Sequence, residues 1–467
     1  MSADSEPIHV STGTFRIDQQ RMLEKLGKFR LAEPAEHILA FCRAAVASSS
    51  GRIDILTLGP GAYELLFDGG SFGKDELKDP LGNLFAGEED WRRGRFLAAG
   101  VLGAFQLGAQ GVSVSSSPPE GPVELTVHPG FEHTLGPPQE PDERNRIRVW
   151  GLDKTLDKVF GAVSKRCARS RVPISIDGLT LGPPDHESEP EPSVLIEGGG
   201  MRGRAWRHIS SDGASLAALS VYGVEAEHAQ LELGPAVVAA EMDDDRLRLD
   251  AGQAKVIRDA RFNELQGRLR DAASELLAQA MDGHRQRLRG AGKAMIKDAS
   301  LLAAWRAGLG APEHEPPGSG KLSRAMHLFM GDTPPDPWTP ERASVLEEAQ
   351  RTRWLRQAAV LWLKGWRDRP IKPSDSLKPL WTASVFLDWK GKPLSFLELR
   401  TALEETNTLA ATDRPWPGEG GKKLHPVLWL TCDADLRAVK IVFPSASMKD
   451  PLLDRKWVPL GRFPNNG

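Results

Sequence analysis

The sequence predicts a mixed α/β protein built from several packed units. Three observations support this: the length of 467 residues, the composition, and the repeated alternation of helix-like and strand-like segments. A chain of this length exceeds one ordinary hydrophobic core and favours roughly two to four units. Because 40% of the residues are hydrophobic and 26% are charged, the composition excludes disorder of the whole chain.

The first block alternates helices and strands over residues 15–116, as the periodicity of its apolar residues indicates. Helices are expected at residues 35–48, 74–83 and 95–107, and strands at residues 52–58, 63–67 and 112–115. A second α/β block follows, with a helix near residues 152–169 and strands at residues 146–150, 174–176, 193–197 and 215–221.

A long amphipathic helix and a Trp-rich C-terminal unit complete the predicted chain. Apolar residues recur at steps of three and four over residues 262–280, which is typical of one buried helix face. Ten of the thirteen tryptophans lie at or after Trp305. In this C-terminal unit we expect a helix over residues 345–366 and a strand over residues 381–389. Ser395 and Glu398 have the spacing of a capping box, which predicts a helix from there to Glu405. Residues 427–431 and 438–443 are expected to complete a further α/β unit.

Clusters of proline and glycine suggest where the units are divided. The run at residues 311–320 is expected to be a true domain linker, and the acidic run at 185–192 a solvated loop inside a domain. We therefore expect domains at residues 1–135, 136–310 and 321–467.

The charge balance bears on the class of partner. Sixty Lys and Arg residues against 63 Asp and Glu give a formal charge of -3, so no overall basic field attracts nucleic acid or anionic lipid. Residues 246–306 carry 13 basic and 7 acidic residues, without the interleaved aromatic side chains that stack on bases. We expect neither nucleic-acid nor membrane binding.

The cysteines and the N-terminus bear on the compartment. Cys42, Cys167 and Cys432 are odd in number and widely spaced, which favours free thiols over a disulfide framework or a four-ligand zinc site. The polar, acidic N-terminal stretch lacks the pattern of a secretion signal, and no apolar run is long enough to cross a bilayer. A cytoplasmic protein is expected.

Three sequence segments in the first block carry a family resemblance through their order. The first, HILAFCRAAVASSSGRIDI at residues 37–55, is a helix followed by a strand; the second, FDGGSFGKDEL at residues 67–77, contains an Asp-Gly-Gly turn; the third, at residues 92–116, is a glycine-containing helix and strand. This order resembles the GHKL superfamily of gyrase, ninety-kilodalton heat-shock chaperones, histidine kinases and MutL proteins, and is closest to the chaperone branch.

The resemblance implies a particular fold and a particular ligand. It implies an N-terminal Bergerat-type α/β sandwich and an S5-like middle or transducer domain. The C-terminal α/β domain rich in Trp is expected from the pattern of residues 321–467 alone, where we find no match to the family. The implied ligand is ATP or ADP, with Asp68 accepting a hydrogen bond from the adenine amine and Gly70 and Gly73 allowing close approach. Gly100 and Gly103 are then candidates on the phosphate side, whereas Phe72 replaces a family glycine.

The groups that hydrolysis requires are missing in this alignment. Ala40 stands where the family has its catalytic glutamate, and Ala44 where it has the asparagine that holds Mg²⁺. An alanine methyl can neither ligate a hard cation nor accept a proton, so Mg²⁺ binding is not expected. Glu36, one turn earlier, is the remaining candidate for a general base.

The resemblance extends into the second block. The segment DDRLRLDAGQ at residues 244–253 precedes the long helix and is similar to a chaperone-branch segment whose arginine reaches the γ-phosphate. Gln253 occupies the matching position, and Lys255 could substitute for the missing charge.

The expected function is that of a degenerate chaperone-like scaffold, a pseudoenzyme that binds nucleotide weakly or without hydrolysis and acts through protein contacts. Two alternatives stay open: an active ATP-dependent chaperone-like ATPase with relocated catalytic groups, and an interaction module without nucleotide. The sequence does not indicate the client protein or the oligomeric state. His128 and His133 are expected to be surface histidines, and the three glycines at 198–200 a turn between strands.

Overall fold

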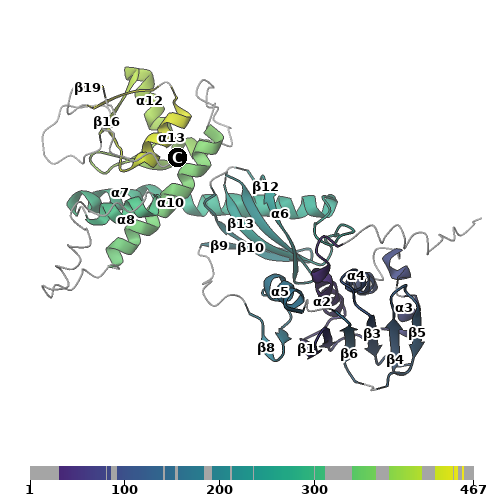
Figure 1. Cartoon of the computed structure of the whole chain (residues 1–467). Helices are drawn as coiled ribbons and strands as arrows, with labels where there is room; N and C mark the ends of the chain where they lie inside the picture. The colour runs from purple at the N-terminus through teal and green to yellow at the C-terminus, as the bar shows by residue number, and fades with distance from the viewer. Residues whose placement is uncertain are drawn as a thin grey trace, which may run out of the picture.

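The computed structural model confirms a mixed α/β protein (Figure 1). It describes residues 31–79, 81–85, 92–139, 142–152, 156–182, 192–210, 213–234, 236–298, 300–310, 339–363, 378–412, 426–444, 446–450 and 455–456. The helices of these residues are α2 (His37–Ala47), α3 (Lys74–Lys78), α4 (Arg92–Gln106), α5 (Leu156–Arg166), α6 (Ala260–Met281), α7 (His284–Lys297), α8 (Ser300–Gly308), α10 (Pro340–Leu363), α11 (Lys378–Thr382), α12 (Phe396–Thr406) and α13 (Asp433–Val442), with 3-10 helices η1 (Pro34–Glu36) and η2 (Gly82–Phe85).

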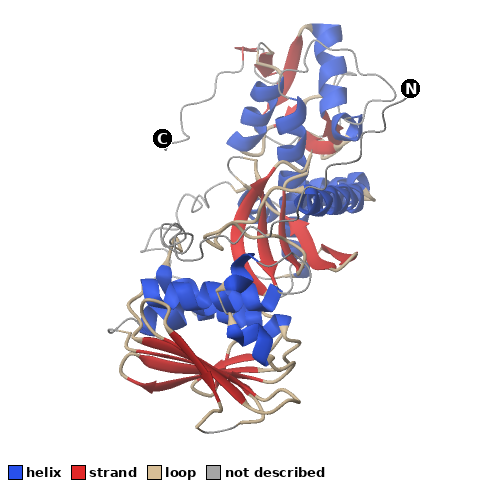
Figure 2. Cartoon of the chain, turned by 90° about the vertical axis from the view of Figure 1, so that its right-hand side faces the viewer, coloured by secondary structure: helices blue, strands red, loops and turns tan. Residues whose placement is uncertain are grey.

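The first unit is an eight-stranded sheet covered by helices on one face (Figure 2). Its strand order is β5-β4-β3-β6-β2-β1-β7-β8, and all described neighbours are antiparallel except β1 and β7. The strands are β1 (Ile53–Gly59), β2 (Ala62–Phe67), β3 (Gly111–Ser116), β4 (Val123–Val127), β5 (His133–Gly136), β6 (Asn145–Trp150), β7 (Ile174–Ile176) and β8 (Leu179–Thr180). Apolar side chains of α2, α4 and α5 meet the buried face of this sheet and form its core.

The second unit is a five-stranded sheet that packs against the long helix α6. The strand order is β12-β11-β13-β10-β9, in which β11 and β13 run parallel. The strands are β9 (Ser193–Gly198), β10 (Met201–Arg207), β11 (Ser215–Val221), β12 (Val224–Leu231) and β13 (Val238–Asp244). The side chain of Asp259 caps α6 by accepting a hydrogen bond from the Phe262 amide, and Leu265, Leu269 and Leu276 are its buried leucine face.

The third unit is a six-stranded sheet with α10, α12 and α13 packed around it. Its order is β15-β14-β17-β16-β18-β19. The strands are β14 (Ser384–Asp388), β15 (Pro393–Ser395), β16 (Thr408–Thr412), β17 (Leu428–Trp429), β18 (Ser447–Asp450) and β19 (Arg455–Lys456). The predicted capping box is confirmed, because Ser395 and Glu398 exchange hydrogen bonds at the start of α12.

Several predicted elements change in the structure. Trp381 belongs to helix α11, so the strand expected over 381–389 shortens to β14, and residues 438–442 are the second half of helix α13. Strands β4, β5, β10, β12 and β13 were not expected. Of the three tryptophans in the helix predicted over 345–366, Trp354 is buried, Trp362 is 39% exposed, and Trp366 lies outside the described residues.

The units defined by strand pairing and helix packing do not end at the expected domain boundaries. Strands β6, β7 and β8 pair into the first sheet, so this unit continues past residue 135 to about residue 181. Helices α7 and α8 lie within residues 136–310, the range expected for the middle domain. They pack instead with α10 and Trp429 of the third unit. The linker expected at 311–320 and most of the loop at 185–192 lie outside the described residues.

Candidate functional site

The Asp68 carboxylate closes the turn between α2 and β1. Its Oδ1 atom accepts hydrogen bonds from the Ser50 hydroxyl at 2.8 Å, the Gly51 amide at 2.7 Å and the Arg52 amide at 2.9 Å. These bonds, led by that from Ser50, hold the pKa of Asp68 below its usual range. The residue expected to bind adenine therefore has its charge directed at its own turn.

The glycines beside Asp68 allow the chain to lie against the end of α2. Gly69 has a φ of 100°, and a Cβ atom there would lie 2.5 Å from the Ser48 carbonyl oxygen, so only glycine fits. The Gly70 amide donates to the same carbonyl at 2.7 Å. Gly73 is the residue before α3, and the space at its Cβ position is open.

Phe72 and Arg93 fill the space next to this turn. Phe72 is fully buried and lies edge-to-face with Phe67 at 6.3 Å between ring centroids. The Arg93 guanidinium lies 4.8 Å above the Phe72 ring, donates to the Gly70 and Ser71 carbonyls at 3.0 Å, and pairs with Glu76 at 2.6 Å. Arg93 was not expected from the sequence; its only signal was the Arg92-Arg93 pair just before the helix predicted over 95–107.

Helices α2 and α4 pack tightly where the resemblance would put a nucleotide. Ala40 and Ala44 on α2 are buried, at 2% and 0% exposure. A Cβ atom on Gly100 of α4 would overlap the ring of Phe41, and one on Gly103 would lie 2.6 Å from the Cβ atom of His37. The candidate phosphate-side glycines are thus contact points between helices.

The histidine at the start of α2 completes this packing. The His37 ring lies 2.9 Å from the Pro34 carbonyl oxygen through Nδ1 and 2.7 Å from the Tyr63 hydroxyl through Nε2. Burial lowers the pKa of His37 to about 4, so the ring is neutral at physiological pH. A neutral, hydrogen-bonded ring is a stable part of a core.

Glu36 forms an ion pair away from the candidate nucleotide site. Its carboxylate lies 3.0 Å from Nε of Arg166 on α5. Arg166 also donates to the Ala226 carbonyl at 2.9 Å, which links the first unit to β12. The contact partners of Glu36 therefore indicate a structural role.

Gln253 contacts α2 from the second unit. Its Oε1 atom accepts a hydrogen bond from Arg43 at 3.3 Å, and Arg43 also donates to the Glu225 carbonyl at 3.2 Å. Arg43 is only 2% exposed, and burial lowers its pKa to about 10. Lys255 has an exposed side chain, and its backbone pairs with Asp250.

The structure brings the four sequence segments of the resemblance together. The first and second segments meet where the Gly70 amide donates to the Ser48 carbonyl. The third segment contacts the second through Arg93, which donates to the Gly70 carbonyl. The segment after β13 contacts the first through Arg43 and the third through Arg92, which donates to the Asp245 carbonyl. The arginines that make these contacts could not be assigned from the sequence, because their partners lie far along the chain.

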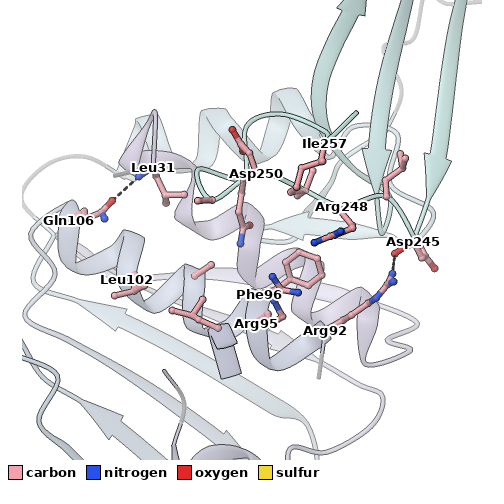
Figure 3. A pocket seen from close by; sticks show the side chains of 16 residues that line it. Leu31, Arg92, Arg95, Phe96, Leu102, Gln106, Asp245, Arg248, Asp250 and Ile257 are labelled. Atoms are coloured by element: carbon pink, nitrogen blue, oxygen red, sulfur yellow. Dashed lines mark hydrogen bonds between the residues drawn. The ribbon is translucent and has the colours of Figure 1, made fainter. Parts of the chain in front are cut away.

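A cavity of about 360 Å³ lies between α4 and residues 245–257 (Figure 3). Of the candidate site residues, only Gln253 lines it. A second cavity, of about 500 Å³, lies between α5 and the five-stranded sheet. Two of the arginines that line it, Arg171 and Arg202, pair with Asp243 of β13 at 3.3 and 3.2 Å.

The structure also describes the cysteines, the two loop histidines and the glycine turn that were considered in the sequence. The three cysteines are free and buried, and the Cys167 thiol together with burial raises the pKa of Cys42. His128 and His133 are exposed, and residues 198–200 form the turn between β9 and β10. Within the described residues, no cluster of three His, Cys, Asp or Glu could hold a metal, and no helix has the length and apolar character to cross a membrane.

Replacing Asp68 tests the structural role of its carboxylate. Asp68→Ala removes three hydrogen bonds and should lower the free energy of unfolding by about 1 kcal/mol at neutral pH, a small loss because the site is solvent-screened. Asp68→Asn keeps an acceptor but not the charge. Because the pKa is depressed in the folded chain, the ionised group stabilises the fold above about pH 4, and this contribution is lost on further acidification.

Urea unfolding of the wild type and both variants between pH 3 and pH 7 measures these effects. The wild type should lose more stability than Asp68→Asn on acidification. Equal stability of the wild type and Asp68→Ala at pH 7 would contradict the assignment.

No protein-family model matches the chain, and no curated protein sequence matches it significantly.

Proposed function

We propose that this protein is a scaffold of GHKL-like architecture, closest to the chaperone branch, that acts through protein contacts and does not hydrolyse ATP. The proposal includes an N-terminal Bergerat-type sandwich, an S5-like middle domain and a C-terminal α/β domain. Two features support it: the helices on one face of the mixed eight-stranded sheet, and the convergence of the four resembling segments. The first segment contacts the second at Ser48 and Gly70, the third contacts the second through Arg93, and the fourth contacts the first through Gln253.

The packing of α4 onto α2 supports the proposal that the protein does not hydrolyse ATP. Gly100 lies directly against Phe41, and the buried side chains at positions 40 and 44 are methyl groups, which can neither ligate a cation nor accept a proton. Elsewhere, Asp68 accepts hydrogen bonds from its own turn and Glu36 pairs with Arg166. A metal-dependent hydrolysis would need a base and a hard-cation ligand at this position.

Exposed edge strands support a role in protein contacts. Strands β8 and β9 are edges of the first and second sheets, and they present Leu179 at 77% exposure and Leu195 at 71%. An exposed strand edge with apolar side chains is a template for pairing with another chain. On α10, Leu361 and Trp362 are adjacent and 42% and 39% exposed.

Thermal unfolding with and without nucleotide, combined with ATP turnover, tests the proposal. A ligand at about 100 times its Kd stabilises a fold by about 2.7 kcal/mol, so millimolar ATP would reveal even weak binding. We expect no shift with ATP or ADP, with or without Mg²⁺, and turnover at background. A turnover abolished by Asp68→Ala and retained by Glu36→Ala would establish the rival ATPase function and overturn the proposal.

A further inference from the structure

We infer that the cavity between α4 and residues 245–257 is a binding site for a small organic anion with an apolar body. The site lies outside the segment expected to bind nucleotide, since Asp68, Gly70, Gly73, Gly100 and Gly103 do not line it. It therefore stands independently of the proposed scaffold function.

The charged lining of the cavity is dominated by arginine. Arg92 and Arg95 extend from α4 toward the segment that carries Arg248 (Figure 3). Arg92 donates to the Asp245 carbonyl oxygen. Arg95 is half-buried and has no hydrogen-bond or ion-pair partner anywhere in the described part of the chain.

The two acids of the lining direct their carboxylates elsewhere. Asp245 accepts two hydrogen bonds from Arg171, at 2.8 and 2.9 Å. Asp250 accepts from the amides of Ala254 and Lys255, at 3.0 and 3.2 Å, and so closes its own loop. Neither acid therefore pairs with Arg95, and a guanidinium such as that of Arg95 binds carboxylate or phosphate with paired hydrogen bonds.

Apart from Gln106 and Gln253, the remaining lining is apolar, which favours a ligand that carries an apolar body as well as a charge. It includes Phe96, Ala99 and Leu102 of α4, and Leu249 and Ile257 of the opposite segment. A volume of about 360 Å³ lies at the lower end of the range of about 300–1,000 Å³ that small-molecule sites occupy. A carboxylate or phosphate on a medium-length alkyl or single aromatic body has the matching chemistry and size.

Such a ligand would contact two units of the fold at once. Its anionic group would lie at Arg95 on α4, in the first unit, and its apolar body would reach Ile257, which precedes α6 in the second unit. Binding would therefore raise the temperature at which these two units unfold, because the ligand binds only when both are in place.

Isothermal titration calorimetry with four probes tests the site in the full-length protein. Octanoate and octyl phosphate combine an anion with an apolar body, 1-octanol lacks the charge, and inorganic phosphate lacks the apolar body. We expect octanoate or octyl phosphate to bind saturably, one per chain, and both controls to bind at least tenfold more weakly. The tighter of the two anions identifies the head group as carboxylate or phosphate.

Three variants locate the binding. Arg95→Gln should lower the affinity for octanoate by about tenfold, which corresponds to about 1.4 kcal/mol for a lost charge-assisted hydrogen bond. Ala99→Leu should abolish binding by filling the cavity, provided that circular dichroism shows a folded chain. Arg270→Gln, on the exposed face of α6, is the matched control and should bind as the wild type does.

Three results would overturn the inference. The first is an absence of saturable binding by either anion. The second is 1-octanol binding as tightly as octanoate. The third is a loss of octanoate affinity in Arg270→Gln equal to that in Arg95→Gln, because this would reflect general surface charge.

Discussion

Gly100→Ala is expected to destabilise the protein by about 1–3 kcal/mol, the usual cost of an extra methyl group in a filled core. The added Cβ atom would overlap the ring of Phe41, which is fully buried and cannot move aside into solvent. This loss should outweigh the gain of about 1 kcal/mol that alanine gives over glycine inside a helix. The measurement is the free energy of unfolding from urea titration, followed by circular dichroism.

Gly267→Ala on α6 is the matched control for Gly100→Ala. Gly267 is also inside a helix, but nothing lies within 4 Å of its Cβ position. This substitution should stabilise the protein by about 0.5–1 kcal/mol, since only helix propensity changes. The double variant Gly100→Ala, Phe41→Leu should recover part of the lost stability, because the smaller side chain makes room for the methyl group.

The Gly100 result also bears on function. If Gly100→Ala were as stable as the wild type, α4 could move away from α2 without cost. The packing that excludes a nucleotide from this position would then be weak, and the proposed non-hydrolysing function would lose its main support.

Asp435→Ala is expected to cost about 3–5 kcal/mol, the typical effect of leaving one buried ion without its partner. Asp435 is 2% exposed and pairs with Arg356 at 2.7 Å, while its second oxygen accepts from the amide and the hydroxyl of Thr431, both at 2.6 Å. Its loss leaves a buried guanidinium and an uncapped N-terminus of α13. Among the described residues, Arg356 would keep its hydrogen bonds to the Val385 carbonyl, at 3.2 and 2.7 Å, and its position over the Phe386 ring.

The fluorescence of the buried tryptophans Trp381 and Trp429 should report this loss during urea unfolding, because both lie in the third unit. Asp433→Ala is the control. Asp433 is in the first turn of the same helix and is partly exposed, so its removal should cost about 0.3–1 kcal/mol through the helix dipole. Equal costs for the two variants would show that the buried pair does not stabilise the unit.

Local patterns in the sequence were sufficient for many of the elements. The apolar period of 262–280 and the capping box at Ser395 depend on residues three or four positions apart, and both are seen in the structure. Strands β10 and β12 were not predicted because about half of their residues are polar, for example Arg202, Arg204 and His228. Most of their apolar residues are small, so the apolar pattern of a strand is weak. The boundary expected at residue 135 differs from the observed unit because the pairing of β6 with β2 and β3 joins distant residues.

The sequence by itself determined the α/β class, the order of the three resembling segments, and the alanines at positions 40 and 44 where reactive groups would be needed. Only the tertiary structure decided what the remaining polar groups do. It directs Asp68 to its own turn, joins Gln253 to Arg43, and leaves Arg95 in a cavity beside apolar side chains. The reason is physical: the role of a charged or polar side chain depends on which partners lie within about 3 Å of it, and in a folded chain many of those partners come from distant segments.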